Sequence, residues 1–476
     1  MKIISILLLL TATRATALTL EPIQFETADG QRVEAEQGRF EVPLHHDRPD
    51  GPKTTLAFVR FPATGDDPGP PIVYLAGGPG GSGINTAQGG RFPLFMALRE
   101  FGDVIALDQR GTGESEPPPP CVAEKTRYTV DQPLTRESFI PYAIDIAQRC
   151  VESWTQQGVD LSAYNSWESA GDLEVLRRVL DAEKLTLWGI SYGTHLALAA
   201  IKRLGDDRID RAILASAEGL EQTVKLPLRW DGYLQRLADT VAADPKASLA
   251  FPDIVGTLRS VLTELEREPV KVKVMPPTPG SAPVELTLGP AAIRFLLAGM
   301  GKNPDSAARM PAFIYGMHAG DFGIAAQQLY GFIYAQPMRL QAMSLAMDYA
   351  SGISDDRLAT VREQARTALM GDVLNYPMPH FVGTLDIPML SDDFRAPLSS
   401  KVPALVLTGT LDGRTFPEAH AEVLAQFANG HHLVIENAGH DLFMVSPAVS
   451  EAILQFMRGE APPERLEIPP PQFLVP

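Results

Sequence analysis

The chain has 476 residues, of which 45% are hydrophobic and 21% charged, and its formal net charge is −17. This length and composition are typical of a globular protein with a sizeable core, built as one large domain with an insertion or as two domains. The acidic balance argues against partners such as nucleic acid and anionic membrane surfaces, both of which attract basic patches.

The first residues form a signal-peptide pattern. Lys2 precedes an apolar run at 3–10, and small residues at 15–17 offer a cleavage site. The run is too short to span a bilayer, and no comparable apolar span follows it. We therefore expect residues 1–17 to be a signal peptide, and the protein to be periplasmic or secreted without stable membrane insertion.

Apolar strands alternate with helical segments through the first half of the chain. Strand-like runs lie at 54–61, 71–75, 103–107, 185–188 and 211–214. Residues 169–180 read as a helix, because Leu173, Leu176 and Leu180 recur at helical spacing. The alternation predicts an α/β fold with a mostly parallel sheet flanked by helices.

The strand at 71–75 runs into a glycine-rich loop at 76–83. Such a loop lets backbone N–H groups approach a developing oxyanion closely. A phosphate-binding loop would require a Lys-Ser or Lys-Thr pair after the glycines, and none follows. We assign one oxyanion donor to the amide of Gly78.

The strand at 103–107 runs into a turn that carries Asp108 and Arg110. We interpret these two residues as a partly buried ion pair that holds the loop, with an architectural role.

The two cysteines are Cys121 and Cys150. Export favours a disulfide between them, and the alternative is two buried free thiols. Neither has a neighbouring pattern that indicates metal binding or nucleophilic chemistry.

The most informative motif is Gly-Ile-Ser-Tyr-Gly at 189–193, between an apolar strand and an apolar helix. A serine in this setting sits on a strained bend, with its hydroxyl exposed at the carboxyl edge of a sheet. Gly189 and Gly193 fit because the bend leaves little room for side chains. The amide of Tyr192, the residue after the nucleophile Ser191, is the expected second oxyanion donor.

From 225 to 390 the alternation gives way to helical stretches, such as 307–329 and 338–349. We expect a mainly helical cap at 225–390, inserted between a first core part at 18–224 and a C-terminal core part at 391–476. A cap over the catalytic edge would exclude water and select substrates by size.

Two later strands each end in a candidate catalytic residue. The strand at 402–407 is followed by Asp412, and the strand that starts at His432 is followed by His440. The order Ser191, Asp412, His440 is the one expected for a catalytic triad in this kind of fold. Asp441 is a poorer candidate for the acid, because it directly follows the base.

Together these segments resemble the α/β-hydrolase superfamily, and more narrowly the branch of tripeptidyl aminopeptidases and prolyl iminopeptidases. The motifs at 77–83, 108–115 and 189–193 carry the resemblance, and 402–459 is similar to the C-terminal region of tripeptidyl aminopeptidases. Ala76 stands where prolyl iminopeptidases usually have histidine, which favours the tripeptidyl side. The resemblance implies hydrolysis of short peptides from the N-terminus, although some relatives are esterases or amidases.

We therefore hypothesise an exported serine aminopeptidase that acts through an acyl-enzyme and needs no metal or organic cofactor. Such an enzyme must hold the free α-amine of its substrate, and Glu218, Glu221 and Asp348 are candidates, unless they are solvated or structural charges. One alternative is a carboxylic-ester hydrolase with the same triad. Another is a non-catalytic binding protein on a hydrolase scaffold. The sequence does not indicate an oligomeric state.

Overall fold

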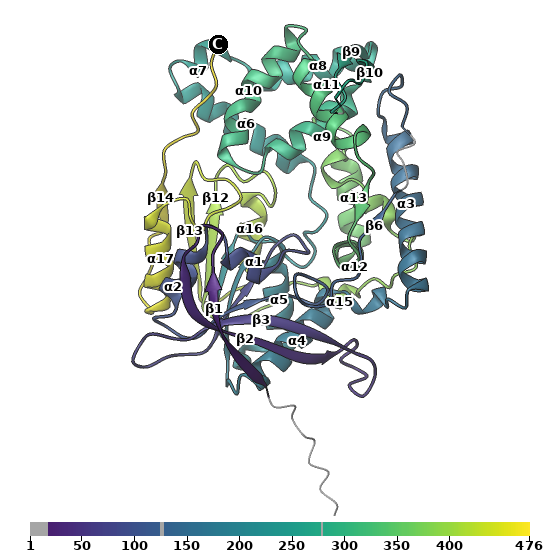
Figure 1. Ribbon diagram of the computed structural model, residues 1–476. Helices are drawn as coiled ribbons and strands as arrows, with labels where there is room; N and C mark the ends of the chain where they lie inside the picture. The colour runs from purple at the N-terminus through teal and green to yellow at the C-terminus, as the bar shows by residue number, and fades with distance from the viewer. Residues whose placement is uncertain (1–17, 124–127, 278) are drawn as a thin grey trace, which may run out of the picture.

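The computed structural model describes residues 18–123, 128–277 and 279–476 (Figure 1). The predicted signal peptide, residues 1–17, lies outside the described residues.

A sheet of ten strands, counted over the described residues, forms the centre of the molecule (Figure 1). In spatial order the strands are β1 (Thr19–Glu26), β2 (Arg32–Pro43), β3 (Lys53–Phe61), β5 (Val104–Leu107), β4 (Ile72–Leu75), β7 (Leu185–Ile190), β8 (Ile209–Ala215), β12 (Ala404–Gly409), β13 (Gly430–Glu436) and β14 (Arg465–Glu467). Pairing is antiparallel from β1 to β5 and parallel from β5 to β14. The prediction of a mostly parallel sheet flanked by helices is confirmed.

Helices cover both faces of this sheet. Along β4, Val73 and Leu75 belong to one buried cluster, while Ile72 and Tyr74 belong to the other. The first cluster includes residues of α3 (Arg136–Gln156), α4 (Ser166–Val179), α5 (Tyr192–Leu204) and α16 (Pro417–Leu424). The second includes residues of α1 (Gly83–Ala87), α2 (Phe92–Leu98) and α17 (Pro447–Met457). Burial on both faces explains why β4 (Ile-Val-Tyr-Leu) and β5 (Val-Ile-Ala-Leu) are continuous hydrophobic runs, without polar alternation.

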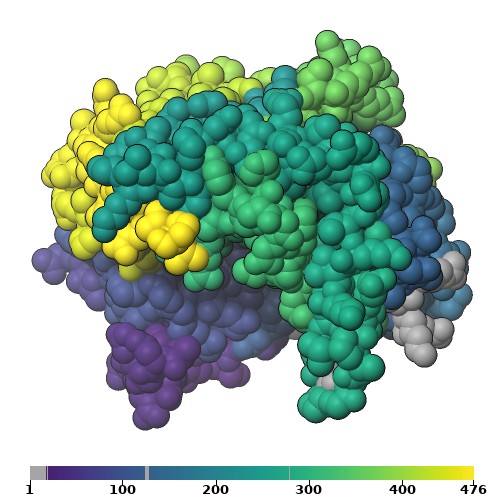
Figure 2. Space-filling model, turned by 90° about the horizontal axis from the view of Figure 1, so that it is seen from above, coloured from purple at the N-terminus to yellow at the C-terminus, as the bar shows by residue number. Residues whose placement is uncertain are grey.

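Between β8 and β12 the chain leaves the sheet and forms a helical segment. It contains α6 (Leu228–Ala243), α7 (Ala247–Ala250), α8 (Ile254–Arg267), β9 (Val270–Val274), β10 (Val284–Leu288), α9 (Pro290–Met300), α10 (Pro304–His318), α11 (Gly323–Leu329), β11 (Arg339–Leu340), α12 (Ala342–Ser351), α13 (Asp355–Gln364), α14 (Met378–Phe381) and α15 (Asp392–Arg395). In the view of Figure 1 its first helices stand above the sheet, and α12, α13 and α15 lie to the right of it. Seen from above, this segment covers much of the surface (Figure 2). The yellow C-terminal tail lies against it, with the N–H of Leu474 donating to the carbonyl of Ala308 (3.3 Å).

Two helix predictions in this segment are wrong in detail. The stretch 307–329 is two helices, because the chain turns at Gly320, whose φ of +90° ends α10. The stretch 338–349 begins with the short strand β11, and α12 starts only at Ala342.

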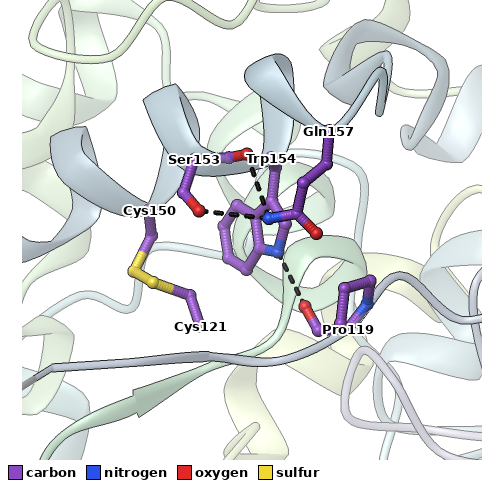
Figure 3. Close-up of a disulfide and its surroundings, with 6 residues drawn as sticks. All are labelled: Pro119, Cys121, Cys150, Ser153, Trp154 and Gln157. Atoms are coloured by element: carbon purple, nitrogen blue, oxygen red, sulfur yellow. Dashed lines mark hydrogen bonds between the residues drawn. A yellow bond between two sulfur atoms is a disulfide. The ribbon is translucent and has the colours of Figure 1, made fainter.

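A disulfide joins Cys121 of β6 (Cys121–Val122) to Cys150 of α3, as the sequence predicts (Figure 3). One turn further along α3, Trp154 donates its indole N–H to the carbonyl of Pro119 (2.8 Å), which fixes the loop just before Cys121 (Figure 3). Cys121 also pairs with Leu340 in the β6–β11 ladder, just before α12. The disulfide therefore ties α3 to the start of α12.

Within the described ranges, none of the helices combines the length and the apolarity that crossing a membrane requires.

Candidate active site

Ser191 occupies a strained turn between β7 and α5. Its φ of +55° lies in the left-handed region, which non-glycine residues adopt rarely and at a cost. A Cβ at Gly193 would lie 2.0 Å from the carbonyl oxygen of Leu75, and one at Gly189 would lie 2.7 Å from Gly193. Only glycine fits at either position, as the sequence predicts. The turn leaves Ser191 partly exposed.

The glycine-rich loop packs directly against this turn. A Cβ at Gly77 would lie 3.0 Å from the Cβ of Ser191, so the loop approaches the serine closely. Its neighbour Gly78 has a φ of +129°, which favours glycine. Tyr192 is the first residue of α5, and its N–H is one of those that a helix N-terminus leaves free. The two amides assigned as oxyanion donors, Gly78 and Tyr192, thus come from neighbouring segments.

Asp108 anchors this loop without pairing with Arg110. Its carboxylate accepts hydrogen bonds from the Ser82 hydroxyl (2.6 Å) and from the N–H groups of Ile84 (3.1 Å) and Glu114 (2.8 Å). Arg110 is buried elsewhere and forms a bidentate ion pair with Asp172 of α4 (2.6 and 2.8 Å). The expected Asp108–Arg110 pair is therefore wrong, because each side chain has its own partners in a different direction.

Asp412 and His440 meet at the carboxyl ends of the neighbouring parallel strands β12 and β13. Asp412 Oδ2 lies 3.0 Å from His440 Nδ1. The carboxylate of Asp412 is fully buried, whereas the His440 side chain is 20% exposed. Because Nδ1 faces Asp412, Nε2 is the nitrogen of His440 that is available to a reacting group.

Several donors converge on Asp412. Oδ1 accepts from the N–H groups of Arg414 (2.7 Å) and Thr415 (3.1 Å), and Oδ2 accepts from the Thr415 hydroxyl (2.8 Å). Burial by itself would raise the pKa of Asp412, but His440, His420 and these hydrogen bonds outweigh it and hold the pKa well below its usual range. Asp412 is therefore ionised at neutral pH.

Asp441, the poorer candidate for the acid, faces away from this pair. Its side chain is exposed and forms an ion pair with Arg91 (2.8 Å).

The helical segment contacts three of the loops that form the site. The carbonyl of Gly301 accepts from the N–H of Gly413 (3.0 Å), and that of Lys302 accepts from the N–H of His440 (3.0 Å). On α12, the Ser344 hydroxyl donates to the carbonyl of Pro79 in the glycine-rich loop (2.9 Å). These bonds fix the loops that carry Asp412, His440 and the predicted oxyanion donor Gly78.

The three candidate amine-binding carboxylates lie in different settings. Glu218 is buried and forms an ion pair with Lys225 (2.8 Å). Burial by itself would raise the pKa of Glu218, but the positive charge of Lys225 outweighs burial, so the pKa is lowered. Glu221 accepts the N–H of Ser354 at the start of α13 (3.1 Å). Asp348 lies on α12, one turn after Ser344, and burial and the charge of Glu218 raise its pKa to about 7.

The sequence did not single out Thr415 or His420, which lie beside Asp412. Thr415 follows the acid by three positions in the turn, and this closeness was the only available signal. Among the described residues, no cluster of three or more histidine, cysteine or acidic side chains is arranged to hold a metal ion.

The family model for the alpha/beta hydrolase fold matches residues 70–447, and the chain belongs to this family.

Curated relatives cover shorter stretches. Serine protease Hip1 of Mycobacterium tuberculosis is 33% identical over 224 residues, which are 45% of this chain and 39% of the relative. Tripeptidyl aminopeptidase of Streptomyces lividans is 28% identical over 238 residues, 44% of this chain and 42% of the relative. Proline iminopeptidase of Aeromonas sobria is 43% identical over 89 residues, 18% of this chain and 20% of the relative. The matches thus span less than half the length of these relatives.

Proposed function

We propose that this protein is a serine hydrolase with Ser191 as nucleophile, His440 as general base and Asp412 as the residue that orients the base. The observation that carries the proposal is the hydrogen bond between Asp412 and His440 at the end of β12 and β13. The strained Ser191 turn follows β7, at the same edge of the sheet.

In the proposed reaction, His440 Nε2 takes the proton of the Ser191 hydroxyl as its oxygen attacks the scissile carbonyl. The amides of Gly78 and Tyr192 stabilise the oxyanion. His440 then gives the proton to the leaving group, which departs and leaves the acyl-enzyme. In the second step His440 takes a proton from water as the water oxygen attacks the acyl carbon, and it returns that proton to the Ser191 oxygen as the ester bond breaks. Asp412 stays ionised throughout, because its pKa is held so low.

We further propose that the substrates are peptides cleaved from a free amino terminus. The similarity to a tripeptidyl aminopeptidase and a proline iminopeptidase supports this specificity. Asp348 is the best candidate for the amine, because Glu218 already binds Lys225. In this scheme residues 225–390 form the cap that limits access, between the core parts 18–224 and 391–476.

Export is part of the proposal. The signal-peptide pattern at 1–17 and the Cys121–Cys150 disulfide both favour an oxidising compartment.

The test compares mature wild-type protein with the Ser191→Ala variant on four substrates: a tripeptidyl anilide, an aminoacyl anilide, the N-acetylated tripeptidyl anilide and a simple acyl ester. We expect hydrolysis and fluorophosphonate labelling in the wild type only, and a preference for a free-amine anilide. Hydrolysis that survives in Ser191→Ala contradicts the triad. A preference for the ester or the acetylated peptide contradicts the aminopeptidase specificity alone.

A further inference from the structure

A chain of hydrogen-bonded hydroxyl and imidazole groups extends from Asp412 into the protein. The Thr415 hydroxyl lies 2.8 Å from Asp412 Oδ2 and 2.9 Å from His420 Nε2. On the other side of the ring, His420 Nδ1 lies 3.1 Å from the Thr408 hydroxyl, which lies 2.9 Å from His432 Nε2. Thr415, His420 and Thr408 are buried, and His432 is half-buried. We call these four side chains the hydroxyl–imidazole chain.

One direction of donation satisfies the whole chain. Asp412 is ionised and can only accept, so the single hydroxyl hydrogen of Thr415 points to it. Thr415 must then accept from His420, which requires the proton of that ring on Nε2. Burial lowers the pKa of His420 to about 4, although Asp412 pulls it upward, so the ring is neutral and its bare Nδ1 accepts from Thr408. Thr408 in turn accepts from His432 Nε2–H.

This direction matters because Thr415 has another possible partner. Its hydroxyl oxygen lies 3.5 Å from His440 Nδ1, the nitrogen that must donate to Asp412. A Thr415 hydroxyl that turned away from Asp412 would leave Oδ2 with one donor fewer and would compete for the His440 proton. The N–H at His420 Nε2 prevents that rotation, because it occupies the side of the Thr415 oxygen to which the hydroxyl hydrogen would otherwise turn.

We propose that His420 is a positioning residue for the catalytic pair: its Nε2–H holds the Thr415 hydroxyl toward Asp412, and this fixes the carboxylate that orients His440. The inference rests on the proposed triad. Both nitrogens of this buried ring have a hydroxyl partner, as a buried imidazole requires, and the partner at Nε2 is the hydroxyl that also contacts Asp412.

The kinetic test uses four variants: His420→Leu, His420→Gln, Thr415→Val and the double variant Thr415→Val/His420→Leu. Glutamine places an amide N–H close to where Nε2 stands, so it is the matched control. We expect His420→Leu to lower kcat about tenfold, the factor that one ordinary hydrogen bond contributes, with KM within about twofold. His420→Gln should keep at least about half of kcat. The double variant should match Thr415→Val, because His420 acts through Thr415.

Three results would overturn the proposal: an unchanged kcat in His420→Leu, a His420→Gln variant as slow as His420→Leu at equal thermal stability, or losses that multiply in the double variant.

A second measurement needs neither activity nor a leucine variant that folds. In wild-type protein with 15N-labelled histidine, NMR reports which ring nitrogen carries the proton, and the His420→Gln spectrum assigns the signal. We expect His420 to be neutral with its proton on Nε2 from pH 5 to pH 8. A proton on Nδ1, or on both nitrogens, contradicts the inference. If the tautomer is as expected but Ser191→Ala retains hydrolysis, the proposed function fails and the hydroxyl–imidazole chain stands as a structural feature.

Discussion

Asp412 and Asp348 are two carboxylates that burial affects alike but whose pKa values shift in opposite directions. Asp412 receives hydrogen bonds from two backbone N–H groups, a hydroxyl and an imidazole, and its pKa is held well below its usual range. Asp348 is subject to burial and to the negative charge of Glu218, which Lys225 and Arg414 only partly offset, and its pKa rises to about 7.

The difference shows that burial alone does not decide whether a carboxylate is charged, because neighbouring donors and charges can outweigh it. Fixed donors around Asp412 stabilise its ionised form at every relevant pH, which suits a residue that orients a base. Asp348 is poised near neutrality, so a cation that binds beside it would drive its ionisation. The α-amine of a peptide is such a cation. The first carboxylate belongs to the sheet edge, and the second to α12 of the helical segment.

The largest expected effect tests the Asp412 side of this comparison. Asp412→Asn keeps the shape of the side chain but no longer holds His440 in the required tautomer, and we expect kcat to fall about 10,000-fold. The control is Asp441→Asn, which alters the neighbouring exposed carboxylate and should leave kcat within about twofold. Steady-state hydrolysis measures both. Equal losses in the two variants would show that Asp412 has no special role.

The next effect tests the charges around Asp348. Lys225→Met leaves Glu218 buried without its cation, and we expect unfolding free energy to fall by about 3–5 kcal/mol in urea titrations. The double variant Lys225→Met/Glu218→Gln removes both charges and should recover most of this loss. If the double variant is as unstable as the single one, the ion pair is not what stabilises this region.

The disulfide also stabilises the surroundings of Asp348. It joins α3 to β6, and Cys121 of β6 pairs with Leu340, just before the helix α12 that carries Asp348. Replacing both cysteines by serine should lower the unfolding free energy by about 3–4 kcal/mol, the chain-entropy value for closing a loop of this length. The sequence separation is 29 residues. Wild-type protein unfolded with a reductant is the control and should match the variant. A variant as stable as the oxidised wild type would contradict this role.

The residues at the sheet edge were predictable because each follows a strand with a local pattern. Ser191, Asp412 and His440 stand just after β7, β12 and β13, and parallel strands bring their carboxyl ends together. The partner of Arg110 was not predictable, since Asp172 lies 62 residues away on a helix with no matching signal. The hydroxyl–imidazole chain likewise depends on tertiary structure, since it joins β12 and β13 to α16 and to the turn that carries Thr415.

Part of the helical segment could have been predicted better. The run Val-Lys-Val-Lys-Val of β9 alternates with the period of a strand, and it pairs with β10 inside the segment that the sequence predicts only as mainly helical. The pKa of Asp348, in contrast, arises from Glu218, Lys225 and Arg414, which only the tertiary structure brings near it.

The smallest effect, on Asp348 itself, is the most informative. For Asp348→Asn we expect kcat/KM to fall about tenfold for a free-amine tripeptidyl anilide at pH 8, because a charged partner of the amine is lost. The acyl ester should change by less than about twofold. Wild-type kcat/KM for the anilide should rise through pH 7, in step with the ionisation of Asp348, and the variant should lack that rise. The ester profile supplies the pH dependence of the proposed triad, without the contribution of the amine.

Although Asp348→Asn should lower the activity on the anilide, it should raise the stability of the folded protein at pH 8. The pKa of Asp348 is raised in the folded state from 3.8 to about 7, so the native protein holds this proton more tightly than the unfolded chain does. The contribution of Asp348 to stability is therefore greatest below pH 4 and declines as pH rises toward 7. Asparagine removes this decline, so the variant should be the more stable protein at pH 8 and equal to wild type near pH 4, as thermal unfolding would measure. A variant that loses both stability and ester hydrolysis at pH 8 would mean that Asp348 supports the fold, and the amine would need another partner.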